Sequence, residues 1–156
     1  MALSMDGRVK FRVLGPLTVT AEDGREVPIG GNKLRIVLAG LLLRGGESVP
    51  VSRLASWLWD EPDDPDRARA TVQSYINRLR RIPELRDLLI TVQDGYRMAL
   101  DAGSLDLLRF RELTAAARAA VAEGDSAAAT EALSAALKLW HHPALSNVDS
   151  PALHRD

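Results

Sequence analysis

The sequence predicts an α+β fold in which a small antiparallel sheet, three helices and a β-hairpin are followed by two further helices. Three observations predict this fold. Apolar and polar residues alternate near the N-terminus, which is typical of half-buried strands. Apolar residues then recur at helical spacing in successive segments before a second alternating stretch. Beyond about residue 104 the chain becomes alanine-rich and loses the strand pattern.

The first strands are expected within residues 8–20. Apolar residues alternate with Arg8, Lys10 and Arg12, and a Gly-Pro pair at 15–16 interrupts the run before residues 17–20 resume it. Asp23-Gly24 is a turn signal, so residues 25–29 are expected to form the next short strand.

Two helices are expected next. The first spans residues 33–43, where leucine and valine recur at helical spacing, and Gly45-Gly46 ends it. Ser52 is the expected N-cap of the second helix, whose inward-facing residues would include Trp57.

A polar loop, a third helix and a hairpin complete the first part of the chain. The loop contains Pro62 and Pro65, and Asp66 is the expected cap of a helix over residues 67–81. Strands over 89–92 and 96–100 enclose a turn and form a β-hairpin wing anchored by Tyr96. The order of sheet, three helices and wing is that of a winged helix-turn-helix, expected over residues 8–101.

The second part, residues 104–156, is expected to begin with a helical hairpin. Helices over 106–122 and 126–140 are separated by Gly124-Asp125, which would end one helix and cap the next. Such a tetratricopeptide-like unit normally needs about three copies for stability. The tail over residues 143–156 therefore indicates a shortened form of a larger helical domain.

The third helix has the composition of a DNA reader. It carries five arginines and no acidic residue between 67 and 81. Val72, Ile76 and Leu79 form one apolar stripe, which leaves a wide polar face. Arginine matches guanine edges, asparagine matches adenine edges, and basic residues attract phosphates. The opposite face and its flanks consist of Arg67, Ala70, Thr71, Ser74, Asn77, Arg78 and Arg81.

The composition excludes several other classes of protein. The chain has no cysteine, no apolar run long enough to span a membrane and no signal-peptide pattern at its start, so a cytoplasmic location is expected. His141-His142 lacks further ligands, and no metal site or cofactor is expected. Trp57 and Trp140 are expected to pack in the core rather than line a ligand cage.

Three functional hypotheses follow from these patterns. The first is a sequence-specific DNA-binding activator. The alternative is a protein-protein docking module that uses the winged helix and the helical hairpin, although a docking helix would carry more apolar anchors than the third helix does. An enzyme is not expected, because the sequence shows no nucleophile-base arrangement, metal-ligand set or phosphate loop.

Several motifs resemble a known family. QSYINRLRR (73–81) and DGYR (94–97) resemble the recognition helix and wing of OmpR/PhoB-type winged helices. FRVLGPL (11–17) and LRIVLAGLLL (34–43), with VSRL (51–54), are similar to the antibiotic-regulatory SARP family. DLLRF (106–110) and ALKLW (136–140) resemble the start of that family's bacterial transcriptional activation domain.

The resemblance implies an activator that binds direct repeats near promoter −35 elements as side-by-side protomers. It would contact RNA polymerase and control secondary-metabolite genes. The polymerase contact would lie in the acidic loop, at Glu61, Asp63 and Asp64. On double-stranded DNA, Asn77, Arg78 and Arg81 would face the groove, with Thr71 and Ser74 at its edge. Arg67 and Arg80 would bind phosphates, and Lys33 and Arg35 are candidates for contact with the DNA backbone. In the wing, Gln93 and Arg97 would contact the DNA.

Two features depart from the family pattern. The wing tip carries Gln93 and Asp94 where relatives often place an arginine, which weakens the expectation of minor-groove insertion. The resemblance to the activation domain also covers only its first part.

Overall fold

The N-terminal sheet is smaller than the sequence predicts. The computed structural model describes residues 9–59, 64–101, 103–141 and 143–155. Strands β1 (Lys10–Arg12) and β2 (Thr18–Thr20) pair antiparallel, with buried Phe11 opposite Val19. The prediction of a strand over residues 25–29 is wrong, because only an isolated bridge joins Glu26 to Thr20. Pro28, which has no N–H, cannot extend that pairing.

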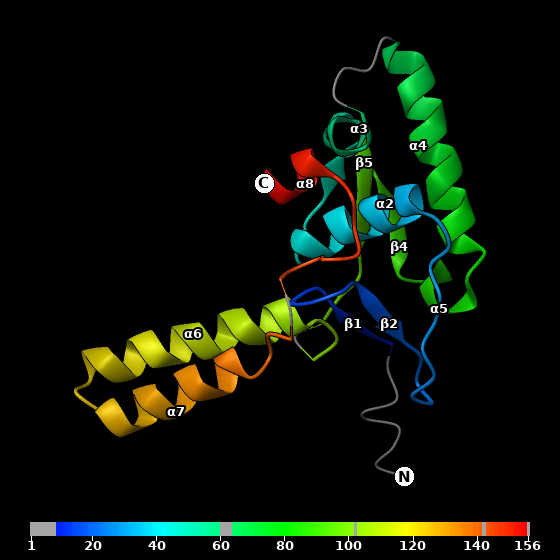
Figure 1. The fold of residues 1–156 in the computed structure, drawn as a ribbon. Helices are drawn as coiled ribbons and strands as arrows, with labels where there is room; N and C mark the ends of the chain where they lie inside the picture. Colours follow the sequence, from blue (N-terminus) through cyan, green and yellow to red (C-terminus); the bar gives the residue numbers. More distant parts are fainter. Residues whose placement is uncertain (1–8, 60–63, 102, 142, 156) are drawn as a thin grey trace.

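Helix α2 (Asn32–Leu43) lies at the centre of the first part of the chain (Figure 1). Every residue from Ile36 to Leu42 is buried. Gly45, with a φ of 61°, follows the C-terminal end as predicted. A helix that is apolar on all sides requires neighbours on all sides, and α2 contacts α3, α4 and β5.

Helices α3 (Val51–Leu58) and α4 (Pro65–Arg80) begin earlier than predicted. Pro50, not Ser52, precedes the first residue of α3. Asp64, not Asp66, caps α4, and its side chain accepts hydrogen bonds from the backbone N–H groups of Asp66 and Arg67. Proline favours the first helical position, so Pro65 fixes the start of α4 at this point.

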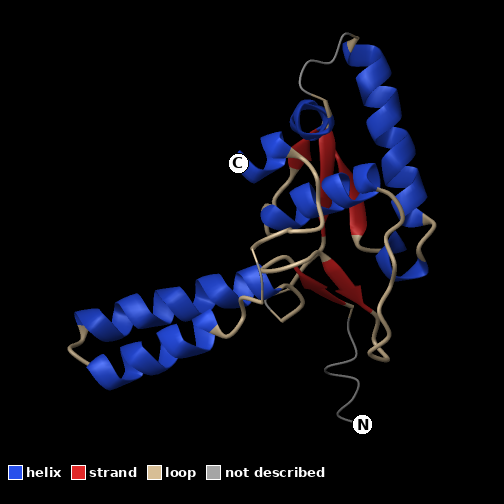
Figure 2. Ribbon diagram, viewed as in Figure 1, coloured by secondary structure: helices blue, strands red, loops and turns tan. Residues whose placement is uncertain are grey.

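A three-stranded sheet forms the wing and its base. The strand order is β3 (Val49–Pro50), β5 (Gly95–Met98), β4 (Leu89–Val92). Figure 2 shows strands of this sheet beside the helices of the winged helix. The hairpin was predicted, whereas β3 was not. A Cβ atom at Gly95 would overlap the backbone of Val49, so glycine lets β3 approach. The short helix α5 (Pro83–Arg86), also not predicted, joins α4 to β4.

The second part begins with the predicted helical hairpin. Helices α6 (Asp106–Ala122) and α7 (Ser126–Leu137) pack against each other and extend away from the side on which α4 lies (Figure 1). Gly124 has a φ of 78°, and Asp125 caps α7 by accepting a hydrogen bond from the Ala128 N–H. Both roles were predicted.

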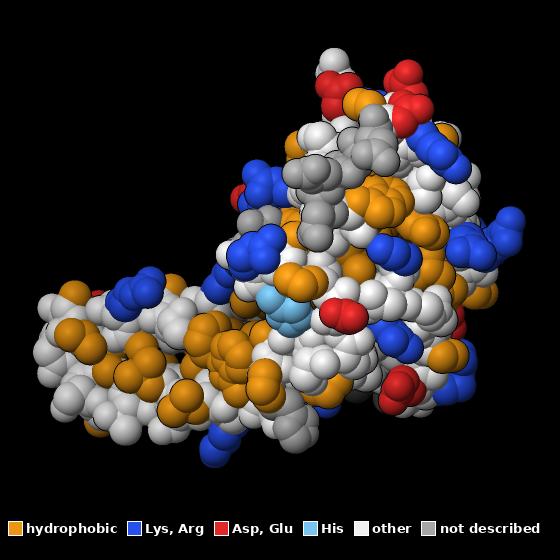
Figure 3. All heavy atoms as spheres, turned by 45° about the horizontal axis from the view of Figure 1, so that its top comes forward, with side chains coloured by type: hydrophobic (Ala, Val, Ile, Leu, Met, Phe, Trp, Pro, Cys, Tyr) orange, Lys and Arg blue, Asp and Glu red, His pale blue; other side chains and the backbone are white. Residues whose placement is uncertain are grey.

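The core prediction is confirmed for one tryptophan and wrong for the other. Trp57 is buried, as is Tyr96 in the wing, but Trp140 is 41% exposed. Helix α7 ends at Leu137, so Trp140 leaves the helical register and makes a T-shaped contact with Phe110 at a centroid distance of 5.7 Å. The hairpin also exposes Leu137, and Figure 3 shows apolar side chains gathered over it.

The chain then turns back onto the winged helix through what we call the return segment, residues 143–155. The Leu145 N–H donates to the Gly15 carbonyl oxygen at 2.7 Å. The Asn147 side chain accepts from the Leu17 N–H at 2.6 Å and donates to the Leu17 carbonyl at 3.2 Å. Side-chain amides bonded in this paired manner hold two backbones in a fixed register.

Helix α8 (Pro151–Arg155) ends the return segment and packs against α3. The buried Ser150 hydroxyl donates to the Trp57 carbonyl at 2.6 Å and accepts from the Leu153 N–H at 3.2 Å. Leu153 is buried in the core that includes α2 and α3. The expected domain boundary near residue 103 stays a prediction, and residues on both of its sides share this core.

We expect Gly40→Ala to destabilise the fold. A Cβ at Gly40 would overlap the ring of buried Trp57. The gain in helix propensity of about 1 kcal/mol is smaller than the overpacking cost, so urea denaturation should show a net loss of about 1–2 kcal/mol. Gly30→Ala is the control, because nothing lies within 4 Å of its Cβ position. Equal stability of the two variants would contradict the α2–α3 packing described here.

Ser150→Ala should lower the free energy of unfolding by about 1–2 kcal/mol, because it removes a buried donor and the bond to the Leu153 N–H. The exposed Ser146 provides a matched control, and Ser146→Ala should change stability little. Thermal and urea unfolding of both variants measure this difference. An unaffected Ser150→Ala protein would mean that the two hydrogen bonds of the Ser150 hydroxyl do not stabilise the fold.

Candidate nucleic-acid interface

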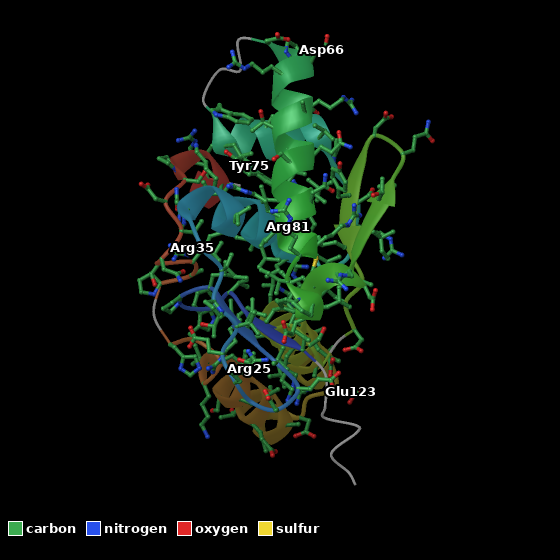
Figure 4. All side chains as sticks on the ribbon, turned by 90° about the vertical axis from the view of Figure 1, so that its right-hand side faces the viewer. Arg25, Arg35, Asp66, Tyr75, Arg81 and Glu123 are labelled. Atoms are coloured by element: carbon green, nitrogen blue, oxygen red, sulfur yellow. The ribbon has the colours of Figure 1, made fainter. Side chains whose placement is uncertain are left out.

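Helix α4 presents a wide polar face because its apolar residues follow one narrow stripe. Val72, Ile76 and Leu79 are fully buried, as their spacing predicts. Figure 4 looks onto the outer side of α4, with Asp66 near one end, Arg81 near the other, and the wing hairpin beside the helix. Apart from Asp66 in the first turn, α4 carries no acidic residue. The outer face is therefore basic at both ends of the helix and carries uncharged polar residues between them.

Five of the eleven side chains predicted to meet DNA lie exposed on this face. Thr71 is half-buried, and its hydroxyl donates to the Arg67 carbonyl at 2.9 Å. Arg69, which the sequence analysis did not assign to the interface, is exposed on the same helix. The exposed members of the predicted set on α4 are Arg67, Ser74, Asn77, Arg78 and Arg81.

Arg80 differs from the other predicted arginines because it is bonded within the protein. It is half-buried, and its Nη2 donates to the Leu89 carbonyl at 3.0 Å and to Thr91 Oγ1 at 2.8 Å. Its guanidinium carbon lies 5.9 Å from the centroid of the Tyr96 ring. The side chain therefore connects α4 to the wing, and its contact with a phosphate stays a prediction.

The two backbone candidates on α2 also have partners within the chain. Lys33 Nζ donates to the Leu58 carbonyl at 2.8 Å and lies 5.8 Å from the Trp59 ring centroid. Arg35 Nε donates to the Ile29 carbonyl at 3.2 Å. These contacts tie the first turn of α2 to the end of α3 and to the preceding loop, and the DNA contacts of both residues stay predictions.

The wing lies beside α4 and ends in a tight turn. Gln93 is exposed at its tip, and Asp94 takes the left-handed conformation with a φ of 62°. Arg97 is half-buried on β5, between the buried residues Tyr96 and Met98. Because side chains alternate along a strand, Arg97 points to the face of the wing opposite to these two.

The acidic loop falls partly outside the described residues. Glu61 and Asp63 are not described, whereas Asp64 is the N-cap of α4. Its carboxylate therefore has a structural role in addition to any contact with a partner.

Across the residues that the structure describes, no cluster of three or more histidine or acidic side chains could hold a metal ion. No described helix is long and apolar enough to cross a membrane.

A helix-turn-helix with a basic outer helix and an adjacent β-hairpin defines a DNA-binding regulator of the winged-helix class. Comparison with known proteins agrees with this class. A family model for the bacterial transcriptional activator domain matches residues 105–156. The transcriptional regulatory protein EmbR of Mycobacterium tuberculosis is 38% identical over 151 residues, which cover 93% of this chain and 38% of that protein.

Two Streptomyces proteins extend the comparison. The regulatory protein AfsR of Streptomyces coelicolor is 36% identical over 146 residues, covering 93% of this chain and 14% of AfsR. The regulatory protein DnrI of Streptomyces peucetius is 31% identical over 150 residues, covering 90% of this chain and 54% of DnrI.

A solved structure of M. tuberculosis EmbR in complex with a low-affinity phosphopeptide superposes on this chain with a TM-score of 0.82 at 35% sequence identity. The superposition covers 95% of this chain and 40% of the EmbR chain. The chain belongs to the SARP family of transcriptional regulators, with a winged-helix DNA-binding domain and part of the bacterial transcriptional activator domain. This is a family of regulators and not of enzymes. The chain spans 14% to 54% of the length of these relatives.

The cap of α4 gives a testable distinction between two neighbouring carboxylates. Asp64→Ala should lower the free energy of unfolding by about 1 kcal/mol, because two N–H groups lose their acceptor. Asp64→Asn should be nearly neutral, since asparagine is an equally good cap. Asp66→Ala serves as a comparison in the same turn and should cost less. Urea denaturation measures all three, and equal losses for the two alanine variants would contradict the assignment of Asp64 as the cap.

Proposed function

We propose that this chain is a sequence-specific DNA-binding transcriptional activator that recognises direct repeats near promoter −35 elements. The observation that carries the proposal is the exposed polar face of α4, where Ser74, Asn77, Arg78 and Arg81 lie on the outer side of a helix packed by α2 and α3. A major groove admits one α-helix, and arginine and asparagine supply the donors that match guanine and adenine edges.

The basic character of this face also supports DNA rather than a protein partner. Lysine and arginine neutralise phosphates and release counterions, which produces affinity that falls with salt. Interfaces between proteins depend instead on aromatic and aliphatic anchors at their centre. The outer face of α4 carries no large exposed apolar residue among those described.

Binding to direct repeats rests on the family resemblance. Protomers on direct repeats point the same way along the duplex, so one surface of each protomer must meet a different surface of the next. A cytoplasmic location and control of secondary-metabolite genes belong to the same part of the proposal.

Contact with RNA polymerase through Glu61, Asp63 and Asp64 is a further part of the proposal. Asp64 immediately precedes α4 and so lies at the end of the helix proposed to enter the groove. A partner bound there would stand beside the DNA.

A second candidate function is docking of another protein on the helical hairpin. The observation that favours it is the exposure of Leu133 and Leu137, at 47% and 70%. The helical hairpin extends away from the side of the molecule on which α4 lies (Figure 1). The two functions therefore use different faces and can be tested separately.

Fluorescence anisotropy tests DNA recognition directly. The protein is titrated onto a duplex with two direct repeats, taken from its own promoter region or from selection out of random DNA, and onto a scrambled duplex. We expect binding to the repeats to be tighter by about a thousandfold or more, with a steep dependence on salt. Weak and equal binding to both duplexes would contradict the proposal.

Arg78→Ala should weaken binding to the cognate duplex by about 1–3 kcal/mol and relax the base preference at one position. The exposed Arg118 on α6 provides a control of equal charge change, and Arg118→Ala should bind like the wild type. Anisotropy on a panel of single-base variants of the site measures both effects. If Arg78→Ala binds like the wild type, α4 is docked differently from the way proposed.

A further inference from the structure

Arg80 makes a set of contacts that separates it from the other arginines of α4. One nitrogen, Nη2, donates to both the Leu89 carbonyl and the Thr91 hydroxyl. The guanidinium also lies against the face of Tyr96 at 5.9 Å, a distance at which a cation is attracted by an aromatic ring. All three partners belong to the wing hairpin.

The topology explains why the wing offers these partners. Strand β4 is at the edge of the three-stranded sheet, because the order is β3-β5-β4. Alternate backbone groups of an edge strand point away from the sheet and need other partners. Thr91 and Tyr96 are opposite each other in the β4–β5 register, so one guanidinium can reach both side chains.

The backbone at Arg80 is held as well. Arg86 Nε, in α5, donates to the Arg80 carbonyl at 3.2 Å. Arg80 is also the last residue of α4, where the chain leaves the helix toward α5 and the wing. The side chain of Arg80 thus holds the wing, and its carbonyl holds α5.

We propose that Arg80 is a positioning residue that sets the place of the wing relative to α4, rather than a ligand of a DNA phosphate. The inference rests on the proposed DNA-binding function. A duplex would meet both α4 and the wing, so their separation decides whether both can bind at once. A rigid wing keeps that separation before DNA arrives and reduces the ordering entropy lost on binding.

Salt dependence distinguishes a positioning residue from a phosphate ligand. Loss of a phosphate contact lowers the slope of log K against log salt by about one, whereas a displaced wing weakens binding without removing a charge contact. Arg80→Gln is expected to weaken binding to the cognate duplex by about tenfold with the slope unchanged. Arg67→Gln is the matched control and should lower the slope, because Arg67 is exposed and is the other arginine predicted to bind a phosphate.

Thr91→Val provides a second variant that keeps every arginine. It removes the hydroxyl that accepts from Arg80 and retains a residue suited to a strand. We expect Thr91→Val to weaken DNA binding in the same direction, and the double variant to lose less than the sum of the two single losses.

Hydrogen exchange of the protein without DNA supplies a readout that does not depend on the proposed function. In Arg80→Gln, the amides of β4 and β5 should exchange faster, while those of α2 and α6 stay as in the wild type. If the wild type fails to prefer the repeats, the proposed function is wrong and this exchange pattern still decides the role of Arg80. A slope lowered by about one in Arg80→Gln, or unchanged exchange in the wing, would overturn the inference.

Discussion

The burial of α2 is the constraint on which the other elements depend. Seven consecutive residues from Ile36 to Leu42 are buried, so this helix offers no face to solvent over two turns. Such a helix is stable only when other elements enclose it. Gly40 brings the Trp57 ring of α3 against the α2 backbone, and α4 packs beside both helices. The orientation of the arginine-rich face therefore follows from how α2 is covered.

Polar contacts at the edges of this core complete the arrangement. Lys33 joins the first turn of α2 to the end of α3, and Arg80 joins the end of α4 to the wing. Asp106, at the first turn of α6, accepts hydrogen bonds from the Val13 and Leu14 N–H groups at 2.9 and 3.1 Å. In each case a charged side chain satisfies backbone groups that lie between two elements. Charged side chains in this protein thus serve to join elements.

The sequence predicts the outer face of α4 because three apolar residues fix the rotation of the helix. It predicts the wing because a turn separates two short apolar strands. Strand β3 has only two residues, too few to form a pattern, and its pairing depends on the space that Gly95 leaves. The cap of α4 was misplaced by two residues, since a carboxylate lies on each side of Pro65 and the preference of proline for the first turn decides between them.

Arg80 and Trp140 show where periodicity is insufficient. At about 100° per residue, Arg80 lies only about 40° from Ile76, beside the buried stripe, and that angle was a signal that it contacts the protein. Trp140 continues the spacing of Leu133 and Leu137, but α7 ends before it. A spacing predicts a common face and does not predict that another element covers that face.

The return segment has a consequence for any recombination between the winged helix and the residues that follow it. Asn147 and Ser150 follow the helical hairpin in sequence, yet their hydrogen-bond partners are backbone groups of Leu17 and Trp57 in the winged helix. A recombination event at the junction near residue 103 would join a winged helix to a foreign return segment. Such chimaeras would fold well only if the two parent proteins form the same contacts between the return segment and the winged helix. Substitutions in residues 145–153 are therefore expected to covary with those around α2 and α3, more strongly than with those in the hairpin itself.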